Sequence, residues 1–138
     1  MGALDEHSGL KELPTKVDGK VVYIDLAEVE RINSCGVRDW MQMIADMSAN
    51  ARVVLTNCSP AIVAQLNFVH RFAGNAIIES ILMPYVCPFC ESEKKISVSA
   101  AQFSRPGFEP PDCQCTDCKV AMVFDDYPQS YLAFSSAR

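Results

Sequence analysis

The chain has 138 residues, a length that suits one domain, or one compact domain with a small metal-stapled appendage. Hydrophobic residues make up 49% of it and charged residues 21%, which excludes a disordered chain. The formal net charge of −5 argues against nucleic acid and anionic membrane surfaces as partners. No run approaches the roughly 18 apolar residues of a membrane helix, and the first residues lack the pattern of a signal peptide, so we expect a cytoplasmic protein.

Strand-like and helix-like segments alternate through residues 1–86. Residues 20–26 (KVVYIDL) form a nearly continuous apolar, β-branched run, which is typical of a strand buried on both faces. Residues 52–56 and 76–82 repeat this texture. Because short loops join these strands to helices, the pattern predicts a parallel or mixed sheet with crossover helices.

Two amphipathic helices are predicted between these strands. The first covers residues 36–47, where apolar side chains recur at helical spacing and should face the core: Val37, Trp40, Met41, Ile44 and Met47. The second follows Ser59, which suits the N-cap, and Pro60, which suits the first helical position. Its inward-facing residues would be Ile62, Val63, Leu66 and Val69.

The segment from Arg31 to Gly36 joins a strand to the first helix. Asn33 or Ser34 should cap that helix, with the side-chain oxygen accepting from an unpaired backbone N–H. A hydroxyl at an exposed helix N-terminus is also a favourable place for a phosphate, because free N–H groups and the positive end of the helix dipole stabilise negative charge. The two interpretations are compatible.

Five of the seven cysteines lie between residues 87 and 118, while Cys35 and Cys58 stand alone. Two C-x-x-C pairs in a chain without a secretory signal indicate metal rather than a disulfide framework. The expected ligands are Cys87, Cys90, Cys115 and Cys118. Zinc is the usual occupant of a structural four-cysteine site, and the spacing leaves iron open.

Cys113 is an alternative ligand, because Cys113-Gln114-Cys115 could replace the second pair. The x₂ spacing favours Cys115 and Cys118. Strand-like residues 96–100 and 120–124, with a proline- and glycine-containing loop at 105–112, complete a predicted zinc ribbon that could not fold without its metal. The predicted division is therefore an α/β domain at 1–86, a β zinc ribbon at 87–125, and an acidic and aromatic tail at 126–138. The tail either packs back on the protein or docks a partner.

Three motifs occur in order along the first part of the chain. They lie at residues 2–7 (GALDEH), 24–36 (IDLAEVERINSCG) and 57–72 (NCSPAIVAQLNFVHRF). They resemble the G-x-L-D turn, the strand with its D-S-S-G or D-S-T-G switch loop, and the S-P-x-V-x-x-L helix of the STAS domain family, in particular bacterial anti-sigma factor antagonists. The resemblance implies a sheet of four to five strands flanked by helices, no enzymatic activity, and signalling through regulated protein binding. The G-x-L-D motif begins at residue 2, so the N-terminal strands of the family look shortened.

The resemblance also implies a phospho-switch. In the antagonists, a partner anti-sigma kinase phosphorylates the Ser or Thr that follows the family's Asp, and only the unphosphorylated form captures that partner. By position this residue is Ser34, and the partner-binding loop is Asn33, Ser34, Cys35 and Gly36. Asn33 stands where the family usually has Asp. A shortened sheet would expose an edge, which favours pairing with a second copy of the chain or with a partner chain.

Three further hypotheses compete with this one. The first is a structural subunit or scaffold of a larger complex, stabilised by zinc and without phospho-switching. The second is redox or metal sensing through Cys113 beside the four-cysteine site. An enzyme is the poorest candidate, because His7 and His70 are far apart in sequence, Cys35 has no motif-linked base, and no glycine-rich phosphate loop occurs.

Overall fold

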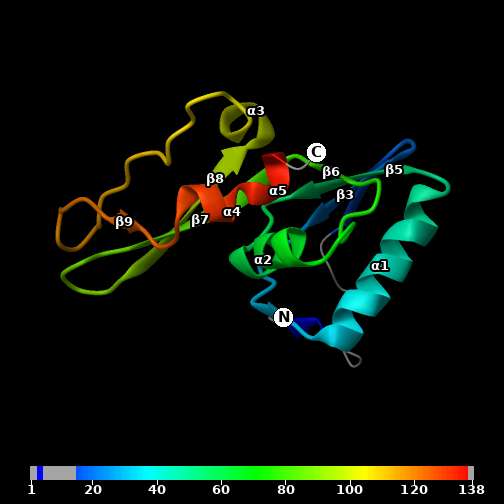
Figure 1. Cartoon of the computed structure of the whole chain (residues 1–138), viewed down its shortest axis with the longest axis horizontal. Coiled ribbons are helices and arrows are strands. Elements are labelled where there is room, and N and C mark those ends of the chain that lie inside the picture. The colour runs from blue at the N-terminus through cyan, green and yellow to red at the C-terminus, as the bar shows by residue number, and fades with distance from the viewer. Residues whose placement is uncertain (1–2, 5–14, 137–138) are drawn as a thin grey trace.

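The structure is a computed structural model and describes residues 3–4 and 15–136 (Figure 1). The described elements, in chain order, are β1 (Ala3–Leu4), β2 (Thr15–Asp18), β3 (Val21–Asp25), β4 (Arg31–Ile32), α1 (Ser34–Ser48), β5 (Arg52–Thr56), α2 (Pro60–Phe68), β6 (Ile77–Ile78), β7 (Ser80–Val86), β8 (Glu93–Ser99), α3 (Ala100–Phe103), β9 (Val123–Phe124), α4 (Pro128–Tyr131) and α5 (Ala133–Ser136). The predicted mixed α/β class is confirmed. Within the described ranges, no helix has both the length and the apolar character needed to span a bilayer.

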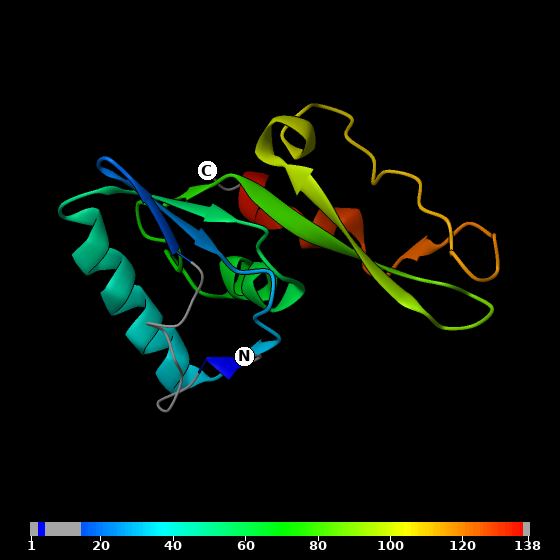
Figure 2. The ribbon, with the colours of Figure 1, turned by 180° about the vertical axis from the view of Figure 1, so that it is seen from behind.

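The N-terminal unit is built on a four-stranded mixed sheet in the order β2-β3-β5-β6. β2 runs antiparallel to β3, whereas β3, β5 and β6 run parallel to one another. Both crossovers, through α1 and through α2, advance in the same direction across the sheet. Right-handed crossovers of this kind place both helices on one face, as Figures 1 and 2 show.

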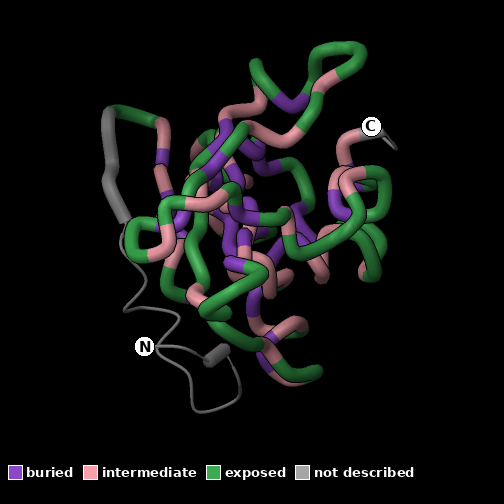
Figure 3. Tube along the Cα trace, turned by 90° about the vertical axis from the view of Figure 1, so that its left-hand side faces the viewer, coloured by how far each residue is buried: buried purple, intermediate pink, exposed green. Residues whose placement is uncertain are grey.

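The main core lies between that face and the two helices. Trp40 of α1 is fully buried, stacks on Phe72 with ring centroids 5.5 Å apart, and donates its Nε1–H to the Phe72 carbonyl at 3.0 Å. Ile44 is also buried, and Val37, Met41 and Met47 pack partly buried against the same core. The core role predicted for Trp40 and its stripe is therefore confirmed. Figure 3 shows the buried segments gathered in the interior of the molecule.

α2 begins as the sequence predicts. Pro60 is its first residue, and the Ser59 hydroxyl accepts from the Ile62 amide. Ile62 and Val63 are buried in the core. The helix ends at Phe68, earlier than the predicted break at Gly74-Asn75, and turns fill the interval.

The predicted third strand, residues 76–82, divides between two sheets. Ile77 and Ile78 form β6 in the four-stranded sheet, and β7 then belongs to a three-stranded sheet in the order β8-β7-β9. A parallel bridge between Cys58 and Ile81 connects the two sheets, with the Cys58 amide donating to the Ser80 carbonyl at 3.0 Å. One core cluster spans both sheets and the C-terminal helices, and the predicted three-part division of the chain stays a prediction.

The C-terminal tail packs back on α2. Tyr131 and Phe134 are buried, and Tyr131 donates its hydroxyl to the Leu82 carbonyl. The Asn67 side chain of α2 donates to the Tyr131 carbonyl at 3.1 Å and accepts from the Phe134 amide at 2.8 Å. The first of the two alternatives predicted for the tail is thus the one observed.

Of the motif predicted as a turn at residues 2–7, only Ala3 and Leu4 are described. They form β1, which pairs in parallel with β4. The other residues of that motif, His7 among them, lie outside the described residues, and a shortened start stays a prediction.

Candidate metal centre

The β7–β8 hairpin carries the first cysteine pair in its turn. The Cys87 amide donates to the Ser92 carbonyl at 2.8 Å, and the Glu91 amide donates back to the Cys87 carbonyl at 3.0 Å. Glu91 takes a positive φ of 62° to close this turn, a conformation that most residues adopt only at a cost. The result is a tight loop that turns the thiols of Cys87 and Cys90 to one side.

The segment before β9 repeats this design. The Cys115 amide donates to the Val120 carbonyl at 2.9 Å, and the Lys119 amide donates to the Cys115 carbonyl at 2.9 Å. Lys119 has a φ of 59°, so the residue after the second cysteine is left-handed in both turns. The Cys118 amide also points at the Cys115 sulfur, 3.5 Å away. Such N–H groups stabilise thiolate charge.

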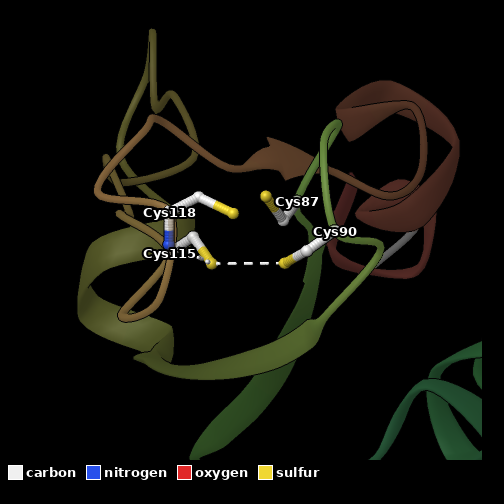
Figure 4. Close-up of side chains that lie close together, drawn as sticks. All are labelled: Cys87, Cys90, Cys115 and Cys118. Atoms are coloured by element: carbon white, nitrogen blue, oxygen red, sulfur yellow. Dashed lines mark hydrogen bonds between the residues drawn. The ribbon is translucent and has the colours of Figure 1, made fainter.

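The two turns bring four sulfur atoms together (Figure 4). The ligand atoms all lie within 4.8 Å of one another, and Cys90 Sγ of the first turn is 3.6 Å from Cys115 Sγ of the second. Cys87 and Cys115 are buried, Cys118 is half-buried, and Cys90 is exposed. The predicted ligands, Cys87, Cys90, Cys115 and Cys118, are therefore positioned to hold a metal ion.

The four thiols do not ionise independently. Hydrogen bonds, first from the Ser92 hydroxyl at 3.0 Å and then from the Ser92 backbone and neighbouring thiols, lower the pKa of Cys90 to about 6. The hydrogen bond with Cys90, followed by burial, raises the pKa of Cys118 to about 12. One sulfur thus loses its proton readily, and its negative charge opposes the loss of the next. A bound cation removes that opposition, because it neutralises the thiolates together.

Cys113 lies outside this cluster. Its thiol is buried and contacts the Met122 sulfur at 3.7 Å, while its carbonyl accepts from the Met122 amide at 2.8 Å. The side chain therefore acts as a small apolar residue in the packing beneath the second turn. The choice of Cys115 and Cys118 over Cys113 agrees with this arrangement.

Tyr85 links the loop that precedes Cys113 to the three-stranded sheet and was not singled out from the sequence. It is buried on the inner face of β7, contacts Phe124 at 5.7 Å between ring centroids, and donates its hydroxyl to the Pro111 carbonyl. Burial, then the nearby charges of Cys113 and Asp112, raises the pKa of Tyr85 to about 12. The alternating pattern of β7 was the available signal, because buried tyrosines usually find a hydrogen-bond acceptor.

The second predicted site, the Ser34 loop, lies at the start of α1. Asn33 is the N-cap: its side chain accepts from the Gly36 amide at 2.8 Å, and its carbonyl accepts from the Val37 amide at 2.9 Å. Ser34 is the first residue of the helix and is exposed, whereas Cys35 is half-buried and Gly36 buried. Figures 1 and 2 show this end of α1 far from the β7–β8 turn. The two predicted sites are separate.

Comparison with known proteins adds no relative: no protein-family model, curated protein or solved structure matches this chain.

Proposed function

We propose that this protein is a non-enzymatic protein-interaction module in bacterial signalling, similar to an anti-sigma factor antagonist, which binds its partner through the Ser34 loop. The observation that carries the proposal is the exposure of Ser34 at the first position of a helix that Asn33 caps. The mixed sheet with two crossover helices supports it, because such a sheet is what the resemblance to STAS domains implies.

Phosphate on Ser34 would act on the partner surface rather than on the fold. The Ser34 side chain stands in solvent, so an added phosphate displaces no core residue. Negative charge at a helix N-terminus is stabilised by the helix dipole. The partner would instead meet about two extra negative charges in its binding surface, which is the basis of the switch. Asn33 keeps the cap neutral, so the charge of this loop would depend on the modification alone.

The metal, in this proposal, is a structural zinc ion. Four cysteine sulfurs from two rigid turns fill a tetrahedral zinc shell, which leaves no open position for a substrate or an activated water. Thiolate ligands of this kind favour zinc or iron over hard cations such as Mg²⁺. The ion would hold the far end of the three-stranded sheet together.

The test uses the zinc-loaded protein and an anti-sigma factor kinase from the same bacterium. We expect incubation with ATP to add one phosphate, which mass spectrometry locates at Ser34. Ser34→Asp should weaken kinase binding by about 10-fold or more, and Ser34→Ala should bind like the unmodified protein even after incubation with ATP. Ser104→Asp, in the exposed turn after α3, is the control for added charge. Equal binding by Ser34→Asp and Ser34→Ala would contradict the switch.

A second candidate is a zinc-stabilised structural subunit without phospho-switching. The continuity of the core through the ribbon and the C-terminal helices favours it, because such a rigid body suits a permanent assembly. It predicts a stable, stoichiometric complex that contains no kinase and is insensitive to Ser34→Asp.

A further inference from the structure

A groove of about 540 Å³ lies between α2 and the three-stranded sheet. On the α2 side it is lined by small side chains and, at the end of the helix, by one aromatic ring: Pro60, Ala61, Ala64 and Phe68. Pro84 of β7 forms part of the opposite wall. The small residues keep the groove open, and Phe68 beside it is 86% exposed.

α2 has more apolar surface than this chain covers. Its nine residues (PAIVAQLNF) include no charged side chain, and a helix that is apolar on every side is normally buried on every side. Ile62 and Val63 are buried in the core, and the Asn67 side chain bonds to the C-terminal tail. Phe68 faces the groove instead. An aromatic residue that stands almost wholly in water beside an apolar groove marks a surface that is covered in a complex.

Charged side chains form the rim of this groove, and the acidic ones outnumber the basic ones. The six residues are all exposed: Glu30, Glu93, Asp125, Asp126, Lys94 and Lys95. None of them forms an ion pair with another described residue. The rim therefore has a formal net charge of −2, from four negative and two positive side chains, and these charges are open to a partner.

The carboxylates stand on both walls of the groove. Asp125 lies against Pro84, because its amide donates to the Pro84 carbonyl at 2.8 Å, and Asp126 follows it. Glu30 comes directly before β4, which contacts α2 on the other side. The two lysines are confined to β8, where Glu93 accompanies them. A segment that lies in the groove would thus meet negative charge on either side of it.

We propose that the groove binds a short segment of a partner protein that combines an apolar side chain with arginine or lysine residues on either side of it. The apolar side chain would pack between Phe68 and Pro84, and the basic residues would meet the carboxylates of the rim. Such pairing of opposite potentials across an interface gives a complex its specificity. This binding does not depend on Ser34 or on a kinase.

The sign of the rim charge selects this occupant over the alternatives. Nucleic acid and anionic membranes are negatively charged, so the rim repels them. A second copy of the chain would bring the same rim of −2 to the first, on a protein whose formal net charge is −5. A basic and apolar segment of another protein matches both the charge of the rim and the apolar walls.

Selection from a library of random short peptides tests the proposal, with the zinc-loaded full chain as bait. Phe68→Ser serves for counter-selection, so that only peptides that need the groove are retained. We expect the retained peptides to share an apolar residue flanked by arginine or lysine. Ile77→Ser is the matched control, since Ile77 is a 44% exposed residue of β6 outside the groove, and it should bind these peptides like the wild type. Zinc content and circular dichroism report whether each variant folds.

Titration calorimetry with one retained peptide then tests the charges of the rim. Asp125→Lys should weaken binding by about 5-fold or more at low salt, whereas Lys95→Glu should tighten it, because the rim becomes more negative. Both effects should shrink as the salt concentration rises. Glu109→Lys, in the exposed loop after α3, makes the same change of charge outside the groove and should leave binding unchanged.

Three results would overturn the inference. The first is a selection in which no peptide distinguishes the wild type from Phe68→Ser, or in which the retained peptides are not basic. The second is an equal effect of Asp125→Lys and Glu109→Lys, which would remove the rim from the interface. The third is a wild-type dimer in sedimentation equilibrium that Phe68→Ser weakens, which would assign the groove to a second copy of the chain.

Discussion

The two ends of this protein are stabilised by different means. In the sheet-and-helix unit, large side chains such as Trp40, Phe72 and Leu55 are fully buried in one core cluster. At the far end of the three-stranded sheet, the buried residues are mostly cysteines, with Met122 beside them. Such small side chains bury little apolar area, so the hydrophobic effect contributes less there. Four cysteines positioned to hold a metal ion stand there in place of large apolar side chains.

Loss of the metal should produce the largest effect and separate the two ends. Structural zinc bound by cysteines contributes roughly 10 kcal/mol or more of apparent free energy, and zinc on these four cysteines would hold the two turns together. We expect Cys115→Ala, or chelation, to unfold residues 86–93 and 113–123 while α1 and the four-stranded sheet stay folded. Amide NMR spectra and metal analysis would show this.

Cys113→Ala is the matched control, because Cys113 packs on Met122 outside the cluster. It should retain one metal ion per chain. Loss of the metal from Cys113→Ala but not from Cys115→Ala would overturn the ligand set.

Truncation of Trp40 should have the next largest effect, and it acts on the other end. Trp40→Ala removes the stacked ring and its hydrogen bond to Phe72, so we expect a loss of about 3–5 kcal/mol in the free energy of unfolding. Denaturant unfolding followed by circular dichroism measures it. Metal binding should persist in the folded variant, and a Trp40→Ala protein that folds but binds no metal would show that the two ends are not separable in this way.

Tyr85→Phe should change how the free energy of unfolding depends on pH in the alkaline range. The pKa of this phenol is raised to about 12 in the folded protein, so the unfolded chain ionises it first, at about pH 10. Its contribution to stability is therefore complete below about pH 10 and is lost as the pH rises toward 12. Unfolding free energies measured across this range should decline less steeply for Tyr85→Phe than for the wild type. Tyr127→Phe, at an exposed site, should match the wild type.

Removal of the α1 cap should have the smallest effect. Asn33→Ala leaves the Gly36 amide without its side-chain acceptor and should cost about 1 kcal/mol, measured by thermal or denaturant unfolding. Ser34→Ala should change stability by less than about 0.5 kcal/mol, because its side chain is exposed at the surface. A Ser34→Ala change larger than that of Asn33→Ala would show that Ser34 has a structural role instead of the proposed signalling role.

Short sequence patterns were sufficient to predict several features of the structure. The helical spacing around Trp40 predicted α1 and its buried stripe, and Ser59 with Pro60 predicted the start of α2. The C-x-x-C spacing predicted which sulfurs would meet, because each pair is brought to one side by hydrogen bonds within its own turn. These features depend on interactions between residues close in sequence.

The tertiary structure decided what depends on contacts between distant residues. The strand predicted at 76–82 divides after Ile78, because β7 finds partners in β8 and β9 rather than in the four-stranded sheet. Of the strand predicted at 120–124, only Val123 and Phe124 form β9.

The groove lined by Phe68 and Pro84 also exists only because α2 and the three-stranded sheet lie side by side in the fold. The sequence by itself therefore determined α1, the capped start of α2 and the four cysteines that meet, because these features depend on interactions within a few residues. Strand pairing, and a groove formed by two different elements, bring together segments that are far apart in the sequence. Only the folded structure therefore decides them.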